Sequence, residues 1–147
     1  MIVVAAKDPQ CTYDYRKWQE VLGLDEDDMK VLFEEAVKSY GFSRHTKEDS
    51  PEMIEMRKEI DMLGWMDKDD APLWLRSIQG GGKPNDAAGR VHHPNHTIAL
   101  KDRAQELEID VRAYAPELGI APEKEDDISA VDFLEMYLKK KVSTVGE

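Results

Sequence analysis

The residues best able to do chemistry are three histidines that stand close together, His92, His93 and His96. Imidazole nitrogens bind zinc and other divalent transition metals, and histidines four positions apart share one face of a helix. Pro94 disfavours a helix through His93, because the residue before a proline is pushed toward extended backbone. Two interpretations stay open: surface histidines that hold no metal, or a metal site formed by all three.

A pair of histidines just before a predicted helix resembles the HNH, or His-Me finger, nucleases. In that family one histidine activates water and a metal ion stabilises the phosphate oxygens. The resemblance implies a metal-dependent nuclease or phosphoesterase in which His92, His93 and Arg90 are catalytic, with zinc or another divalent transition metal as cofactor. The sequence predicts no pair of strands before His92, which counts against this family. The nuclease or phosphoesterase is therefore the alternative hypothesis, and the main hypothesis is a binding protein without a cofactor.

Two further motifs carry less chemistry. The run from Gly80 to Lys83 lacks the pattern of a phosphate-binding loop, because Ser77 stands where its first glycine is needed and Pro84 where Ser or Thr is needed. We expect a mobile linker there. Cys11 is the single cysteine, which excludes an intramolecular disulfide and is typical of a reducing compartment.

The charge of the chain is strongly acidic but unevenly spread. The 147 residues carry a net charge of −11, which argues against binding nucleic acid with the whole surface. Residues 71–104 nevertheless sum to +3. The cations of this basic region are Arg76, Lys83, Arg90, Lys101 and Arg103. Weak nucleic-acid binding through residues 76–103 is therefore a third hypothesis.

Helix signals recur along most of the chain. Asp25 is suited to cap a helix that ends at Gly41, and Ser50 followed by Pro51 is typical of another helix start. Leu73, Trp74, Leu75 and Ile78 are expected on a short buried helix that begins at Asp70. Together the caps and apolar periods predict helices at 12–22, 25–40, 50–63, 70–79, 97–107 and 127–142.

These patterns predict an all-α fold, a single compact domain of about six helices with a long Gly-rich loop. Residues 107–113 alternate between apolar and polar, so a short strand competes with a helix end there. The expected parts are an N-terminal arm at 1–11, N-terminal helices at 12–79, the loop at 80–96, C-terminal helices at 97–142 and a tail at 143–147.

The function expected from the sequence is that of an acidic regulatory module, not an enzyme, which binds a protein partner or self-associates. A basic partner would suit the acidic helix faces. The candidate partner-binding residues are Asp25, Glu26, Asp27 and Asp28 in the acidic run and Met53, Met56 and Met62 in the Met-rich third helix. No apolar stretch is long enough for a signal peptide or a membrane span, so we expect no membrane contact and an intracellular location, in cytoplasm or nucleus.

Overall fold

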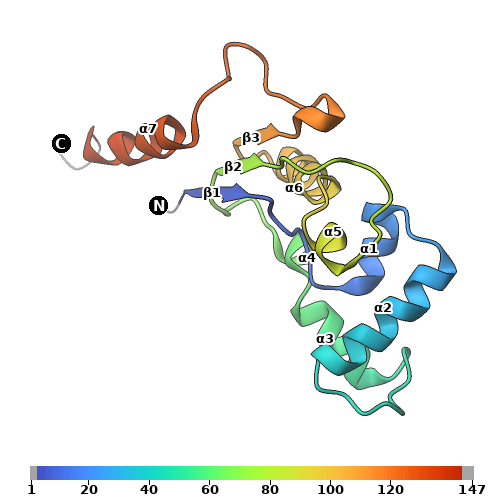
Figure 1. The fold of residues 1–147 in the computed structure, drawn as a ribbon. Helices are drawn as coiled ribbons and strands as arrows, with labels where there is room; N and C mark the ends of the chain where they lie inside the picture. The colour runs from blue at the N-terminus through green and yellow to red at the C-terminus, as the bar shows by residue number, and fades with distance from the viewer. Residues whose placement is uncertain (1–2, 144–147) are drawn as a thin grey trace.

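The computed structural model describes the backbone of residues 3–143 and the side chains of residues 3–139. Met1 and Ile2 of the expected arm, and residues 144–147 of the expected tail, lie outside the described residues. The centre of the fold is a three-stranded parallel sheet, in the order β1 (Val4–Lys7), β2 (Leu73–Arg76) and β3 (Val111–Tyr114) (Figure 1). The predicted all-α class is therefore wrong, and the fold is mixed α/β with a small share of strand.

The largest correction concerns residues 70–79, which form β2 instead of a short buried helix. The backbone of β2 is bonded on both sides, since Val4 N–H donates to Pro72 O at 3.0 Å and Leu73 N–H donates to Asp110 O at 2.9 Å. A central parallel strand is covered on both faces and therefore reads as a continuous apolar run, which periodicity alone cannot separate from a buried helix. The N-terminal arm was likewise missed as β1. Of the two alternatives left open for residues 107–113, a strand or a helix end, the structure has a strand, β3, which begins at Val111 and ends at Tyr114.

The helices between β1 and β2 follow the predicted caps closely. Asp25 forms a complete capping box with Asp28, and Gly41 has the positive φ expected of a helix stop. The first helix begins at Tyr15, after its cap Asp14, and not at residue 12 as predicted, and the third ends near Ile60, before the predicted end at residue 63. The observed helices are α1 (Tyr15–Leu22), α2 (Glu26–Ser39), α3 (Pro51–Glu59) and the short α4 (Met62–Trp65).

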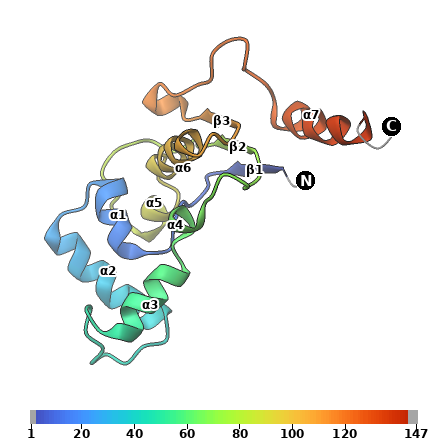
Figure 2. The ribbon, with the colours of Figure 1, turned by 180° about the vertical axis from the view of Figure 1, so that it is seen from behind.

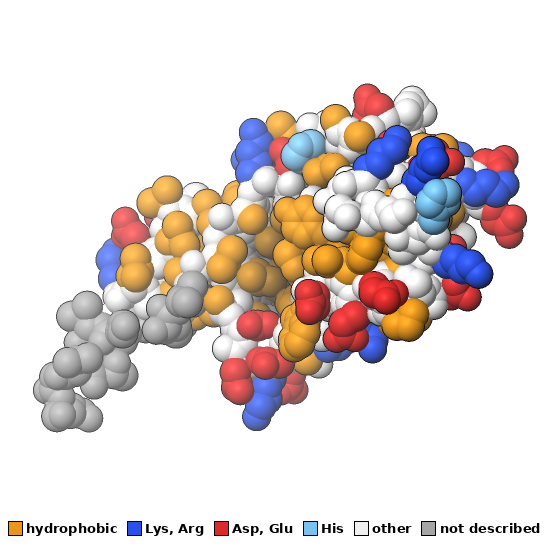
Figure 3. Space-filling model, turned by 90° about the horizontal axis from the view of Figure 1, so that it is seen from below, with side chains coloured by type: hydrophobic (Ala, Val, Ile, Leu, Met, Phe, Trp, Pro, Cys, Tyr) orange, Lys and Arg blue, Asp and Glu red, His pale blue; other side chains and the backbone are white. Residues whose placement is uncertain are grey.

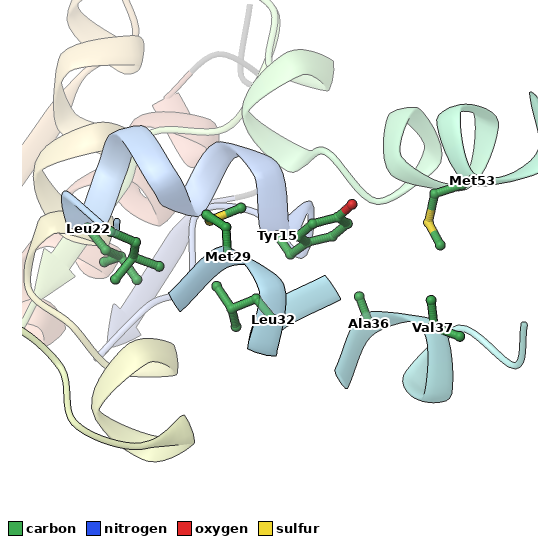
Figure 4. Close-up of a cluster of buried hydrophobic side chains, with 8 residues drawn as sticks. Tyr15, Leu22, Met29, Leu32, Ala36, Val37 and Met53 are labelled. Carbon is green, nitrogen blue, oxygen red and sulfur yellow. The ribbon is translucent and has the colours of Figure 1, made fainter. Parts of the chain in front are cut away.

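The first three of these helices share one apolar core. Tyr15 and Leu22 of α1 point toward α2, and Met53 of α3 closes the far end of the cluster (Figure 4). From α2 the cluster takes Met29, Leu32, Ala36 and Val37. Each of its side chains is at most 6 % exposed, so this helical unit is stabilised by its own core at a distance from the sheet.

The remaining helices cover the two faces of the sheet. Helix α6 (Asn95–Glu106) packs on β2 and β3, on the face where Leu75 and Ala113 are buried. Helix α7 (Ala130–Ser143) lies against the opposite face, and both ribbon views place it far from α2 and α3 (Figures 1 and 2). The turn η1 (Pro116–Leu118) follows β3, and the expected loop at 80–96 contains a short helix, α5 (Ala87–Val91).

A second apolar cluster holds α7 on the sheet. Phe133 is fully buried, and its ring lies 5.2 Å from that of Tyr137, while both pack against Trp74 of β2. The guanidinium of Arg112 lies 5.9 Å from the Phe133 ring centre. Seen from below, hydrophobic side chains gather in the middle of the molecular face and on the segment beside the grey terminal residues (Figure 3). The sheet is thus covered by α7 around Trp74.

Candidate ligand-binding site

His96, the most promising residue in the sequence, is fully buried and already has a partner on each ring nitrogen. Its Nε2 lies 2.8 Å from the carbonyl oxygen of Arg90, which can only accept, so Nε2 carries the proton. Its Nδ1 is therefore an acceptor and receives a hydrogen bond from the Cys11 thiol, whose Sγ lies 3.1 Å away. Burial lowers the pKa of His96 and raises that of Cys11 to about 12, so the pair is neutral and is not an activated thiolate.

His93 is also engaged through both ring nitrogens. The backbone N–H of Asn95 donates to its Nδ1 at 3.1 Å, so Nε2 carries the proton and donates to Gly82 O at 2.9 Å. His92 is exposed at the end of α5, and the three rings share no ligand. The described residues contain no group of three or more His, Cys, Asp or Glu side chains able to hold a metal ion. The geometry thus gives the metal-site alternative no free imidazole nitrogen at His93 or His96.

The acidic run and the Met-rich helix have structural roles in the fold. Asp25 accepts from the backbone N–H groups of Asp27 and Asp28, and the Asp28 carboxylate accepts from the Asp25 N–H. Met53 is fully buried and offers no surface to a partner. Glu26 and Asp27 are exposed, Met56 is half-buried and Met62 is 37 % exposed.

The basic region of residues 71–104 is neutralised by acidic side chains over most of its extent. Arg90 makes a two-pronged contact with Glu35 of α2, at 2.8 and 3.1 Å. Lys83 bridges the carboxylates of Asp25 and Asp28. Lys101 and Arg103 pair with Asp102 and Glu106. The exception among the five cations is Arg76, which has no carboxylate partner in the described part of the chain.

Arg76 stands at the carboxyl end of β2, directly beside Lys7 at the carboxyl end of β1. The two are register partners, so their side chains leave the sheet on the same face. Lys7 is exposed and, like Arg76, has no acidic partner among the residues described. In an acidic chain, two neighbouring cations without counter-charges form a local positive site.

A cavity of about 570 Å³ opens beside Arg76 on this face. Its floor is formed by Trp74, Arg76 and Tyr114, whose side chains share one side of the sheet by register. Its walls come from the turn after β3 and from the segment before α7. These wall residues are Pro116, Gly119, Ile120, Ala121, Asp127, Ile128 and Ser129. Aromatic and apolar walls with a few charged groups are typical of small-molecule sites.

The wall before α7 is fastened to the floor by aromatic side chains. Trp74 Nε1–H donates to Ile128 O at 2.9 Å, and the Tyr114 hydroxyl accepts from Ile128 N–H at 2.9 Å. Because the same hydroxyl lies 2.8 Å from Ile128 O, it donates back to that carbonyl. The two-way contact fixes Ile128 and its neighbour Asp127 over the sheet, so the cavity has a defined outline without a ligand.

The Gly-rich segment after β2 is held at several points and is not free of the fold. Asp8 accepts from the Ile78 N–H at 3.1 Å and from the Ser77 hydroxyl at 3.3 Å. A side chain at Gly81 would meet Leu118 of η1 at 2.2 Å, so the segment passes closely over the turn after β3. The hydrogen bond from His93 Nε2 to the Gly82 carbonyl oxygen fixes the segment at a further point. The role that remains for His93 is to position the loop beside the carboxyl edge.

The site combines residues that the sequence analysis found with others that it missed. Arg76 was recognised as part of the basic region, whereas Lys7, Tyr114 and Asp127 were not singled out. Lys7 and Arg76 come together only because two short segments, 69 positions apart, pair as parallel strands. The available signal was the apolar run before Lys7, which is typical of an edge strand as well as of an arm.

Comparisons with protein-family models, with curated proteins and with solved structures found no significant match. Within the described residues, no helix is both long and apolar enough to cross a membrane. The argument about function therefore depends on the geometry of the site itself.

Proposed function

We propose that the protein binds a small anionic ligand at the carboxyl edge of its parallel sheet. The observation that carries the proposal is the unpartnered cation Arg76, which lines an aromatic cavity, with a second unpartnered cation, Lys7, beside it on the neighbouring strand. In open parallel α/β sheets, ligands characteristically occupy the crevice outside the carboxyl ends of the strands. The cavity volume falls within the range of about 300–1,000 Å³ that is usual for small-molecule sites.

The electrostatics of the strand pair support an anion at this position. Like charges placed side by side on neighbouring strands destabilise a sheet, and a bound anion between Lys7 and Arg76 would reverse the sign of that interaction. The other cations of the basic region are occupied by carboxylates, which leaves these two available. Phosphate and carboxylate are the anionic groups that a guanidinium recognises best, because its paired N–H groups match their oxygens.

Titration of the full chain with ribose 5-phosphate, followed by calorimetry, tests the proposal. A charge-assisted hydrogen bond contributes about 1.5–3 kcal/mol, so Arg76→Gln should weaken binding about ten- to a hundredfold. Lys7→Gln should weaken it as well. Lys47→Gln removes an exposed cation outside the site and should leave the affinity unchanged. Absence of binding, or equal affinity in Arg76→Gln and the wild-type protein, would contradict the proposal.

As a second candidate we propose the self-association expected from the sequence, now through α7. The observation that favours it is the flank of α7 that carries Val131 and Leu138, which are 63 % and 59 % exposed at a spacing of two helical turns. Light scattering over a range of protein concentrations tests this directly. A concentration-dependent increase in mass that Leu138→Glu abolishes is expected, and a monomer at every concentration refutes it.

A further inference from the structure

The cavity carries a second charged group that a simple anion would leave unused. Asp127 lines the wall opposite the strands and, like Arg76, has no oppositely charged partner in the part of the chain that is described. Its Oδ1 lies 3.2 Å from the Tyr114 hydroxyl, whose proton goes to the nearer Ile128 carbonyl oxygen. The carboxylate therefore keeps its capacity to accept hydrogen bonds from a ligand.

Between the two charged groups the cavity is apolar and aromatic. Tyr114 and Trp74 lie with their ring centres 5.1 Å apart, and Pro116 and Ile120 face them from the turn after β3. Trp74 is largely covered by the residues of α7, so the half-exposed ring of Tyr114 is the surface offered to a flat ligand group. A ligand that fits has an anionic end, a flat body and a hydrogen-bond donor at the far side.

The charge of the cationic end indicates the kind of anion. Two adjacent cations match a phosphate monoester, which carries about −1.5 to −2 charges at neutral pH, better than they match a single carboxylate. Nucleoside monophosphates are a large class of ligands that combine a flat, hydrogen-bonding ring with a phosphate monoester. Nucleobases stack on aromatic side chains, and a carboxylate accepts hydrogen bonds from the N–H groups of a base.

We infer that the ligand is a nucleoside monophosphate, which binds with its phosphate at Lys7 and Arg76, its base against Tyr114 and an N–H donor of that base at Asp127. This inference rests on the proposed anion-binding function and adds the identity of the rest of the ligand. In this arrangement Lys7 and Arg76 supply affinity for the phosphate. Tyr114 and Asp127 distinguish a nucleotide from other phosphate esters.

The test compares AMP, GMP, CMP and UMP with ribose 5-phosphate, each titrated into the full chain and followed by calorimetry. At least one nucleotide should bind more than about tenfold tighter than ribose 5-phosphate, because stacking of the base on Tyr114 and a hydrogen bond from the base to Asp127 both add to its affinity. Asp127→Asn should reduce this difference by the share that the hydrogen bond from the base contributes, while it leaves the affinity for ribose 5-phosphate unchanged. Glu125→Gln, an exposed change in the same segment, is the matched control and should alter neither affinity.

The possible failures separate the two proposals. If ribose 5-phosphate binds through Arg76 but no nucleotide binds more tightly, the inference about the nucleotide is overturned and the anion-binding function stands. If Asp127→Asn weakens nucleotides and ribose 5-phosphate equally, the assigned role of Asp127 is overturned. If neither kind of ligand binds, both proposals are wrong. Circular dichroism of each variant checks that the fold is retained.

Discussion

Removal of the Phe133 ring should detach α7 from the sheet and cost a large part of the stability. The ring is fully buried, and it touches Trp74 and Tyr137 and lies under the guanidinium of Arg112. Truncation of a buried phenylalanine to alanine costs about 3–5 kcal/mol, and the better helix propensity of alanine returns about 0.5 kcal/mol. The net loss of about 2.5–4.5 kcal/mol is about a quarter to under a half of 10 kcal/mol, the middle of the 5–15 kcal/mol range that is typical for the stability of a domain.

The assay is equilibrium unfolding in urea, followed by circular dichroism and tryptophan fluorescence. Val131→Ala is the matched control, because it also places alanine in the first turns of α7 but removes a side chain that is 63 % exposed. That variant should change the free energy of unfolding by no more than about 0.5 kcal/mol. If Phe133→Ala and Val131→Ala lower the free energy of unfolding equally, the packing of α7 on the sheet is refuted. The cavity wall that α7 positions would lose its support as well.

Three further results are expected from buried or paired groups. Burial lowers the pKa of His96 below its ordinary 6.5, so, as the pH falls, the unfolded chain takes up a proton at this histidine at a higher pH than the folded chain does. The free energy of unfolding should therefore decrease as the pH drops below 6.5. In urea titrations, His96→Gln should make this decrease smaller. Burial also raises the pKa of Cys11 to about 12, so iodoacetamide should leave the native thiol unmodified and alkylate it in urea; rapid alkylation of the native protein would contradict the structure. Lys83 lowers the pKa of Asp25 to about 2, and NMR titration should find it nearer its ordinary 3.8 in Lys83→Gln.

The helices could be predicted well because their signals are local. The Asp25 capping box, the Ser50-Pro51 start and the Gly41 stop depend on residues within one or two turns of each other. The sequence therefore reveals them without knowledge of the rest of the chain. The errors at helix ends, such as the start of the first helix at Tyr15 instead of residue 12, are shifts of a few residues.

The sheet could not be predicted in the same way, because each strand is only four residues long and its partners are distant. Val4 pairs with Leu73, and Leu73 with Val111, across connections that contain several helices. A four-residue apolar run has no period by which a strand can be distinguished from part of a buried helix. The site could not be predicted for the same reason, because Lys7 and Arg76 are adjacent only through the pairing of β1 with β2. Only the presence of Arg76 in a basic region was visible in the sequence.

A chain with a net charge of −11 can still bind an anion, because the fold pairs most cations of the basic region with carboxylates but leaves Lys7 and Arg76 without one among the residues described. Helix α2 lies beside the basic region and supplies the carboxylates that neutralise Lys83 and Arg90. Lys7 and Arg76 point from the face of the sheet that carries α7, away from α6, and no acidic side chain of the described residues reaches them. At ordinary ionic strength, charges more than about 10 Å away are largely screened, so the nearby charges of Lys7, Arg76 and Asp127 set the field in the cavity and the distant acidic residues do not. The acidic remainder of the surface then disfavours long polyanions such as nucleic acids, while a small ligand that contacts only the carboxyl edge is accepted.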